Sequence, residues 1–522
     1  MREISITLSE GLNKGLRRSS KNPRNSESLI EAYNVKCGIM GLEPFTPLST
    51  DITSPDLAGT RTPQLFNTGI GLFIATEIGV YPVYYDFSVG AIKITSTNLI
   101  GGLNWSMADF SKFHHWCDGG VLYMGDPAQA TAYTTYTTAV HLSYMEGAVL
   151  GFPNIIRIGE MGGRLFIVCM PYYDVVGAGD PDDFVFYENY RNKVIWSRAG
   201  DAGPLTIARM INLLVGNTAG FVDGEMVGYG LLAMPWYGTI ECLKQLGKAM
   251  VVYGSPDFYV PLTGSTYNPS TGGVGAMIQY TDPYPTFGYE SISHIGVPRG
   301  RPVAGDDNHH VFVDADGVIW HITSEFKKER LGYEEFIKPL LDASNQYIYV
   351  SHEPINDEFY ITGGTTGYLL GKTGLTKVYQ PVMSTIPASA FPTGDVVRSK
   401  QAICRTLGTD LSAVICTDVF DFGIRGIKTI TGLELGGYST GILSANVDYR
   451  YNTNEAFTTS SYKIASRNGT VTPIVSGVDF RIRIKSSTST DFDLDYIVVR
   501  AKLVDKRMVR GIYESKTVKA TT

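Results

Sequence analysis

The stretch NHHVFVDADGVIWHI, residues 308–322, has the pattern of a complete β-hairpin. An apolar run precedes the turn Asp314-Ala315-Asp316-Gly317, and a second apolar run follows it. An Asp-Gly pair favours the positive φ that a tight hairpin turn requires. We therefore predict two antiparallel strands joined by this turn.

Similar strand-turn-strand segments recur along the chain between residues 61 and 395. They begin with turn residues and continue with an apolar, aromatic-rich strand: GIGLFIATEIGVYPVYY from Gly69, GGVLYMGD from Gly119, GGRLFIVCMPYYD from Gly162, GKAMVVYGSPDFYV from Gly247 and NQYIYVSHEPINDEFYI from Asn345. Successive starts are separated by roughly one or two multiples of 40–50 residues, which is the blade period of a β-propeller. The sequence thus predicts a mainly all-β chain with a β-propeller over residues 61–395.

The two ends differ from this repeat. Residues 1–60 are rich in Asn, Ser and Pro with scattered apolar residues, and we interpret them as an N-terminal arm or strap that docks on another body. Residues 396–522 contain alternating strands, with Val447, Tyr449 and Tyr451 and Phe480, Ile482 and Ile484 on one face and Asp448, Arg450, Arg481 and Arg483 on the other. This period of two predicts a C-terminal antiparallel β-sandwich with one face solvated or docked, followed by a flexible tail.

Two segments have helical spacing. PLTIARMINLLVG begins at Pro204, a favourable first helical position, and SEFKKERLGYEEFIKPLLDA begins at Ser324, with Thr323 and Ser324 as candidate caps. We predict both as helical linkers between blades.

The cluster around residue 314 also resembles a metal site at first sight, because His309, His310, Asp314, Asp316 and His321 fall within 13 positions. A helix-loop-helix calcium loop would need further oxygen ligands after Gly317, where apolar residues stand instead. A sialidase-type Asp-box would need Asp at Ala315. We predict a blade hairpin here, with no metal and no cofactor.

No constellation of catalytic residues is recognisable. The sequence contains no GxSxG, P-loop or HExxH motif, and the adjacent carboxylates Asp182-Asp183 and Glu334-Glu335 do not form a glycosidase pair. We therefore expect a protein that is not an enzyme.

Eight residues are candidates for an interface or for facing DNA. They are the basic N-terminal group, a possible turn pair after the strand in NKVIWSRAGD (residues 192–201), and two basic C-terminal residues: Arg17, Arg18, Lys21, Arg24, Arg198, Asp201, Lys506 and Arg507. Ordinary solvated charges are the alternative, because aromatic residues are not interleaved with the basic ones. The formal net charge of −7 disfavours wholesale wrapping of nucleic acid.

The N-terminal sequence lacks the continuous apolar stretch of a signal peptide, and no segment has the length of an uncharged membrane span. Six widely spaced cysteines without a CxxC pair indicate reduced, buried thiols. We expect assembly in a host cytoplasm.

The order of these pieces resembles the tail nozzle, tail hub or packaged-DNA-stabilisation proteins of short-tailed bacteriophages. The similarity runs from LIEAYNVKCGIMGLEPFTPLS through IIRIGEMGGRLFIVCM, KVIWSRAGD, ECLKQLGKAMVVYGSPDFYVP, HVFVDADGVIWHIT and YIYVSHEPINDEFYIT to VDFRIRIKSS. After EFYIT, such proteins often carry an Asp and Trp pair at a blade turn, which TTGYLLGKTGLTKVYQP lacks.

The resemblance implies a structural protein of the virion tail. Several copies, typically six, would form a ring that extends the DNA channel, retains the packaged genome and lets it pass at ejection. Its partners would be adaptor or portal-complex proteins above, tail fibre or needle proteins, and the genomic DNA in the lumen. Two alternatives stay open: a glycan-binding or glycan-hydrolysing propeller, suggested by the aromatic residues of 265–290, and a receptor-binding tail-tip protein.

Overall fold

The computed structural model describes most of the chain between residues 3 and 504. The longer segments outside the description are 20–27, 46–62, 97–103, 126–133, 137–154, 176–183, 187–191, 215–227, 257–271, 281–285, 388–395, 405–410 and 505–522, together with stretches of one to three residues elsewhere.

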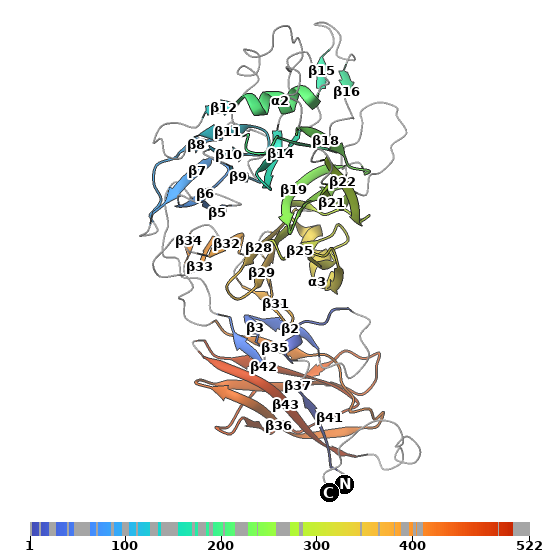
Figure 1. Ribbon diagram of the computed structural model, residues 1–522. Helices are drawn as coiled ribbons and strands as arrows, with labels where there is room; N and C mark the ends of the chain where they lie inside the picture. Colours follow the sequence, from blue (N-terminus) through green and yellow to red (C-terminus); the bar gives the residue numbers. More distant parts are fainter. Residues whose placement is uncertain are drawn as a thin grey trace.

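Five four-stranded antiparallel sheets are arranged as the blades of a β-propeller, and a β-sandwich lies below them (Figure 1). The predicted all-β class and the propeller are confirmed. The blades are β5–β8 (Gln64–Thr68, Gly71–Ala75, Gly79–Val83, Ile94–Thr95), β9–β12 (Ser106–Phe110, Phe113–Cys117, Leu122–Gly125, Thr134–Tyr136), β13, β14, β17 and β18 (Ile155–Met161, Arg164–Cys169, Lys193–Trp196, Gly230–Ala233), β19–β22 (Thr239–Leu246, Ala249–Ser255, Gly273–Tyr280, Thr286–Ser293), and β24–β27 (Val303–Gly305, His309–Val313, Ile319–Thr323, Lys328–Gly332). A short pair, β15 (Tyr173–Val175) and β16 (Phe184–Phe186), interrupts the third blade.

In three blades, one buried polar side chain organises the hairpin between the second and third strands by accepting hydrogen bonds. In the fifth blade, Asp314 Oδ1 accepts hydrogen bonds from the backbone N–H groups of Asp316 and Val318, and its Oδ2 accepts from Trp320 Nε1 at 2.7 Å. Asp118 acts in the same way in the second blade, and the Thr76 hydroxyl does so in the first. The predicted turn at Asp314–Gly317 is confirmed, with Gly317 at φ 84°.

A sixth meander follows the fifth blade: β28 (Tyr347–Glu353), β29 (Glu358–Thr362), β30 (Gly367–Leu370) and β31 (Leu375–Val378), with β23 (Arg299–Arg301) parallel to β28. A three-stranded sheet, β32 (Ser384–Pro387), β33 (Val396–Ser399) and β34 (Ile403–Cys404), comes next. This sheet contacts the first blade: the backbone N–H of Leu65 in β5 donates a hydrogen bond to Ser384 Oγ at 3.0 Å. Strands β33 and β34 of this sheet lie beyond residue 395, the predicted end of the propeller, and that boundary stays a prediction.

The two helices differ in part from the prediction. Helix α2, Pro204–Leu214, begins at Pro204 as expected, but it lies between the third and fourth strands of one blade and not between blades. Helix α3, Glu334–Ala343, does link the fifth blade to the next meander.

The predicted start of α3 at Ser324 is wrong. Residues 328–332 instead form strand β27, in which Lys328 pairs with Ile322 and its ammonium lies 4.3 Å from the centre of the Trp320 ring. Strand pairing at the blade edge thus overrides the helical spacing. Neither described helix has the length and apolar character of a membrane span.

The N-terminal segment is part of this chain's own sheets. Strand β1, Glu3–Leu8, pairs with β43 (Phe492–Leu503) of the sandwich, and the hairpin of β3 (Val35–Cys37) and β4 (Leu42–Pro44) joins the same sheet. A 3-10 turn, Leu12–Lys14, precedes β2 (Leu29–Tyr33), which lies between β31 of the propeller side and β35 (Val414–Thr417) of the sandwich. The expectation that this strap docks on another body is therefore corrected for its described residues.

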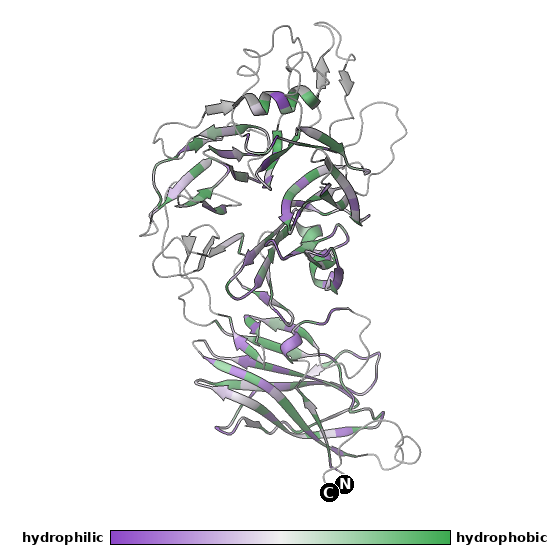
Figure 2. Cartoon of the chain, viewed as in Figure 1, coloured by the Kyte–Doolittle hydropathy of each residue, from purple (hydrophilic) through white to green (hydrophobic). Residues whose placement is uncertain are grey.

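The C-terminal sandwich has two facing sheets. One contains β36 (Lys428–Ser439), β40 (Thr470–Val471), β41 (Val475–Gly477) and β43 (Phe492–Leu503); the other continues from β35 through β42 (Asp479–Ser486), β37 (Leu443–Arg450), β38 (Thr458–Thr459) and β39 (Lys463–Ile464). Figure 2 shows the apolar and polar alternation along these strands. It reflects a core of buried residues from both sheets, including Leu433, Val447, Phe480, Ile482 and Val499.

The predicted apolar face holds for Val447, Phe480, Ile482 and Ile484, but Tyr451 is 48% exposed because β37 ends at Arg450. On the opposite face, the Phe457 ring lies between two guanidinium groups, at 4.6 Å from Arg450 and 4.1 Å from Arg481. A loop of the same chain thus covers part of the predicted polar face.

Replacing the buried carboxylate of the fifth-blade hairpin should destabilise the propeller. Asp314→Ala leaves the Trp320 indole N–H and two backbone N–H groups without their acceptor, and we expect a loss of about 2–4 kcal/mol. Urea unfolding followed by tryptophan fluorescence measures it. Asp316→Ala is the matched control, because Asp316 is exposed and should change stability by less than about 0.5 kcal/mol. Equal effects of the two changes would contradict this account.

Candidate functional site

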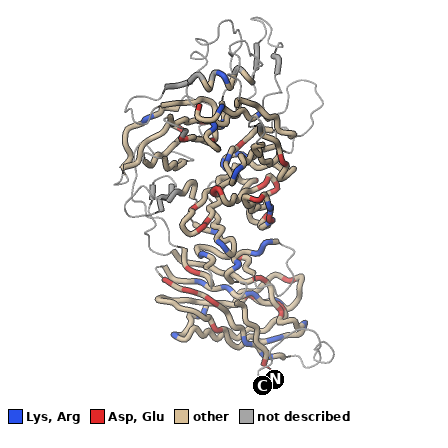
Figure 3. Tube along the Cα trace, viewed as in Figure 1, with Lys and Arg blue, Asp and Glu red and all other residues tan. Residues whose placement is uncertain are grey.

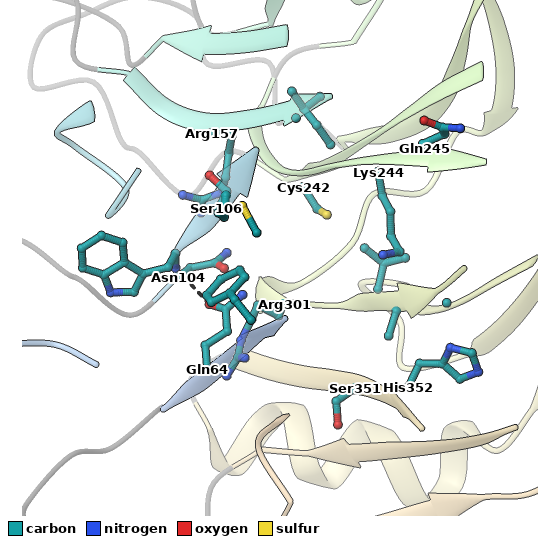
Figure 4. A pocket seen from close by; sticks show the side chains of 18 of the residues that line it. Gln64, Asn104, Ser106, Arg157, Cys242, Lys244, Gln245, Arg301, Ser351 and His352 are labelled. Carbon is teal, nitrogen blue, oxygen red and sulfur yellow. Dashed lines mark hydrogen bonds between the residues drawn. The ribbon is translucent and has the colours of Figure 1, made fainter. Parts of the chain in front are cut away.

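The inner strands of the propeller surround a cavity of about 530 Å³. Its lining comes from β5, β9, β13 and β19, and from residues 301–306, 350–352 and 384–385. Figure 4 shows that many of these side chains are polar, among them Gln64, Asn104, Ser106, Arg157, Lys244, Gln245, Arg301, Ser351 and His352. A concave site with several converging polar groups is the usual character of a ligand pocket or a lined passage.

One buried ion pair joins the third and fourth blades at this cavity. The Arg157 guanidinium lies 3.2 Å from Glu241 Oε2, and its Nε donates to the Glu241 backbone carbonyl at 2.6 Å. Glu241 Oε1 in turn accepts a hydrogen bond from Ser255 Oγ at 2.9 Å. Because both charges are buried and mutually satisfied, this pair holds the two inner strands together rather than offering a free group to a ligand.

Arg301 has no such partner. It is only 9% exposed, and burial lowers the pKa of Arg301 to about 10, so that it stays protonated at neutral pH. Its guanidinium lies 5.1 Å from the centre of the Tyr349 ring, and its Nη2 is 3.5 Å from the Pro63 carbonyl oxygen. Among the described residues no carboxylate pairs with Arg301, and its Nε lacks a hydrogen-bond partner. The cavity wall therefore holds an unneutralised positive charge suited to an anion.

A second cavity, of about 220 Å³, lies between the fifth blade, the sixth meander and the strap. Its lining includes Arg18, His309, His321, Tyr333 and Asp357. The imidazoles of His309 and His352 both approach Asp357 Oδ1, with their Nε2 atoms at 3.0 and 3.1 Å. Burial lowers the pKa of His352 and that of His321, which favours the neutral rings.

Arg17 clamps the strap to both halves of the molecule. Its Nη2 lies 2.5 Å from Glu335 Oε1 in α3, and its Nη1 lies 3.5 Å from Asp418 Oδ2 beside the sandwich. The hydrogen bond to Glu335 is the main reason why the pKa of Arg17 is raised. The predicted interface residue Arg17 thus serves an interface within its own chain. Its neighbour Arg18 has an exposed side chain, and the Arg18 carbonyl accepts a hydrogen bond from the Tyr333 backbone N–H.

The expected strand in NKVIWSRAGD is confirmed as β17, which pairs with β14 and β18. Arg198 and Asp201 are joined in this turn through the backbone, because the Asp201 N–H donates to the Arg198 carbonyl at 3.3 Å, and their side chains have different surroundings. The Asp201 carboxylate accepts hydrogen bonds from Thr206 and Tyr229 and lies 3.9 Å from Arg209 Nη1, because α2 packs next to the turn. The Arg198 side chain is exposed.

The other four candidates, Lys21, Arg24, Lys506 and Arg507, lie outside the described residues. The aromatic segment 265–290 is described only in part. Its residues 273–280 form β21, and its residues 286–290 are the first part of β22. Figure 3 shows that acidic and basic residues are interspersed along the described blades and sandwich strands.

Sequence reasoning missed Arg157, Glu241, Arg301, His352 and Asp357. The sequence singled out only one member of the cluster formed by His309, His352 and Asp357, which is His309. The other two members lie 43 and 48 positions further along the chain. No local motif links residues that far apart, since the blade packing alone brings them together.

Comparisons with known proteins give no family for this chain and only weak structural similarity. No protein-family model matches the chain, and no curated protein matches it significantly. Among solved structures, the Neurospora crassa Pan2 WD40 domain is 6% identical, with 68% of this chain and 91% of that chain covered and a TM-score of 0.35. BamB from Moraxella catarrhalis is 10% identical, with 69% and 97% covered and a TM-score of 0.32. An exo-beta-1,3-galactanase from Phanerochaete chrysosporium is 8% identical, with 78% and 97% covered and a TM-score of 0.28.

Removal of the Arg17 guanidinium should loosen the strap. Arg17→Ala breaks contacts to two carboxylates, and because Arg17 is partly exposed we expect a loss of only about 1–2 kcal/mol. Hydrogen exchange of residues 12–19 should accelerate. Arg425→Ala, which removes an exposed arginine of the sandwich, is the control and should leave both quantities unchanged. Unaltered exchange in Arg17→Ala would show that the clamp does not secure the strap.

Proposed function

We propose that this chain is a structural subunit of a short bacteriophage tail, acting in a nozzle or hub ring that retains the packaged genome and lets it pass at ejection. The observation that carries the proposal is the strap: it joins propeller and sandwich through one shared sheet, in the chain order that such tail proteins have. Domains joined by a small polar interface normally move relative to one another. A subunit that must withstand the pressure of packaged DNA needs a stiff junction of this kind.

The surface of the sandwich supports a docking role. In the part of the chain that the structure describes, eight of the fifteen exposed large hydrophobic residues belong to it: Ile427, Tyr438, Ile442, Tyr451, Tyr462, Ile464, Ile474 and Val504. Ile464 pairs with Ser444 on the neighbouring strand, two positions along the chain from Ile442. Clustered exposed apolar side chains are typical of protein interfaces. The sandwich is thus the proposed contact with adaptor or portal-complex proteins above, or with further copies of the chain.

In this proposal the protein resides in the virion tail and is a homo-oligomer, with six copies as the typical number for the family it resembles. A head-to-tail ring needs two different complementary surfaces on each subunit. In this proposal both surfaces lie on the sandwich, which has one outer face on each of its two sheets.

The ring can be tested directly on the purified full-length chain. Mass photometry and negative-stain electron microscopy should show hexameric rings with an axial channel wide enough for duplex DNA. A chain that stays monomeric at every concentration would overturn the proposal.

The sandwich surface can be tested in the same assay. Ile442→Asp with Ile464→Asp places two charges in the apolar set and should lower the ring fraction at least about tenfold, since buried unpaired charges oppose association. Ile78→Asp with Ile295→Asp is the matched control, because both are exposed isoleucines of the propeller. Circular dichroism verifies folding of both double variants. Equal ring fractions would place the interface elsewhere.

One observation favours a second function, a propeller that binds acidic glycans. The buried Arg301, which has no carboxylate partner among the described residues, would pair with a sugar carboxylate in the central cavity through charge-assisted hydrogen bonds. A glycan array should then give signal for acidic and not for neutral glycans, and Arg301→Lys, which loses the planar fork, should weaken it. Absence of selective signal would remove this alternative.

A further inference from the structure

Three side chains from two neighbouring sheets direct metal-binding atoms toward one point. His309 opens β25 in the fifth blade, whereas His352 and Asp357 flank the turn between β28 and β29 in the sixth meander. The two imidazole Nε2 atoms lie 3.0 and 3.1 Å from Asp357 Oδ1, and all three atoms lie within 4.8 Å of one another. Ligand atoms around a tetrahedral zinc ion, with bonds of about 2.0–2.2 Å, are about 3.3 Å apart. The two histidine–aspartate separations are already close to this spacing, and the two nitrogens, at most 4.8 Å apart, would move together on binding the ion.

The surroundings fix each ligand. Asp306 Oδ1 lies 3.4 Å from His309 Nδ1, which is the carboxylate-histidine arrangement that orients imidazole ligands of metals. The His352 ring stacks on Phe359 with centroids 4.4 Å apart and an angle of 13° between the rings. Asp357 has φ 58°, a left-handed conformation that sets its carboxylate in the turn. Neither histidine can therefore rotate freely away from the common point.

Space and further donors are available on one side of the cluster. His309 and Asp357 line the 220 Å³ cavity, and the His321 ring lies 5.3 Å from that of His309 between their centres. Three protein ligands beside an open cavity leave room for a water molecule or a fourth ligand on the ion.

We propose that His309, His352 and Asp357 form a binding site for a divalent first-row transition metal, Zn²⁺ in the first instance. Two imidazoles and one carboxylate are the donors that zinc accepts in proteins, whereas Mg²⁺ and Ca²⁺ prefer all-oxygen sites. The ion fastens the fifth blade to the sixth meander at the place where the strap passes. The site does not depend on ring assembly, so its test is separate from that of the proposed function.

The test uses the full-length chain, stripped with EDTA and dialysed. Isothermal titration with ZnCl₂ should show one ion per chain, and CoCl₂ should produce the visible absorption bands of four-coordinate Co²⁺. At Zn²⁺ concentrations 100-fold above the Kd, the Tm should rise by about 2–3 °C. Hydrogen exchange should slow in two separate segments, 309–313 and 353–358, because the ion links them.

Asp357→Asn is the decisive variant. Asparagine tolerates the left-handed backbone and keeps the size of the side chain, but it removes the charge, so Zn²⁺ affinity should fall more than tenfold without loss of fold. Asp316→Asn, an exposed aspartate in a nearby turn, and His294→Gln, an exposed histidine, are the matched controls and should bind as the wild type does.

Two results would overturn the site. If the wild-type chain gives no titration heat, no cobalt bands and no change in Tm, the cluster is a hydrogen-bonded triad only. If Asp357→Asn binds Zn²⁺ as tightly as the wild type, the ion is held elsewhere. Should Asp357→Asn fail to fold, the cobalt spectrum and the exchange pattern of the wild-type chain decide the question.

Discussion

The architecture depends on strand β2, which pairs with a propeller strand along one edge and with a sandwich strand along the other. On one edge it runs parallel to β31 at Tyr33 and Lys377, and on the other it pairs antiparallel with β35. Without this strand, the last meander of the propeller and one sheet of the sandwich would each expose an unpaired edge, which promotes wrong associations. With it, eleven strands form one sheet that crosses the junction.

The hydrophobic core also crosses the junction between the propeller and the sandwich. One cluster of buried residues includes Leu16 and Leu29 of the strap, Ile348 and Leu375 of the meander, and Ile482 of the sandwich. Burial of apolar area from three parts of the chain in one cluster makes their stabilities interdependent. The molecule is thus a propeller and a sandwich in appearance (Figure 1), but the region around the strap belongs to both.

Charged groups are placed in two different ways inside this framework. At the Arg157–Glu241 pair and at Arg17 with its two carboxylates, opposite charges meet across sheet boundaries and hold elements in register. Arg301 and the histidine cluster lie next to cavities instead, with capacity left for an external group. A propeller that served only as a spacer would gain nothing from desolvating an unpaired guanidinium, because burial of an unpaired charge is costly. The two cavities are therefore where the proposed glycan-binding and metal-binding roles of this chain can be tested.

Local patterns in the sequence determined much of the fold. The hairpin at residues 308–322, the strand in NKVIWSRAGD, the first turn of α2 and the buried face of Val447, Phe480, Ile482 and Ile484 all follow from nearest-neighbour chemistry: turn residues, proline placement and period-two alternation. Each of these features is set by side chains within about ten positions of one another.

Only the tertiary structure decided the rest. Residues 328–332 have a helical pattern, yet they complete a blade, because hydrogen bonds to β26 outweigh a weak local preference. The strap pairs with strands about 340 to 500 positions away, and His309 meets His352 and Asp357 through blade packing. Such contacts depend on which sheet edges remain open once the blades have formed. That is a property of the folded chain and not of any short segment, which is why the sequence alone left the strap without its partner and the cluster of His309, His352 and Asp357 unrecognised.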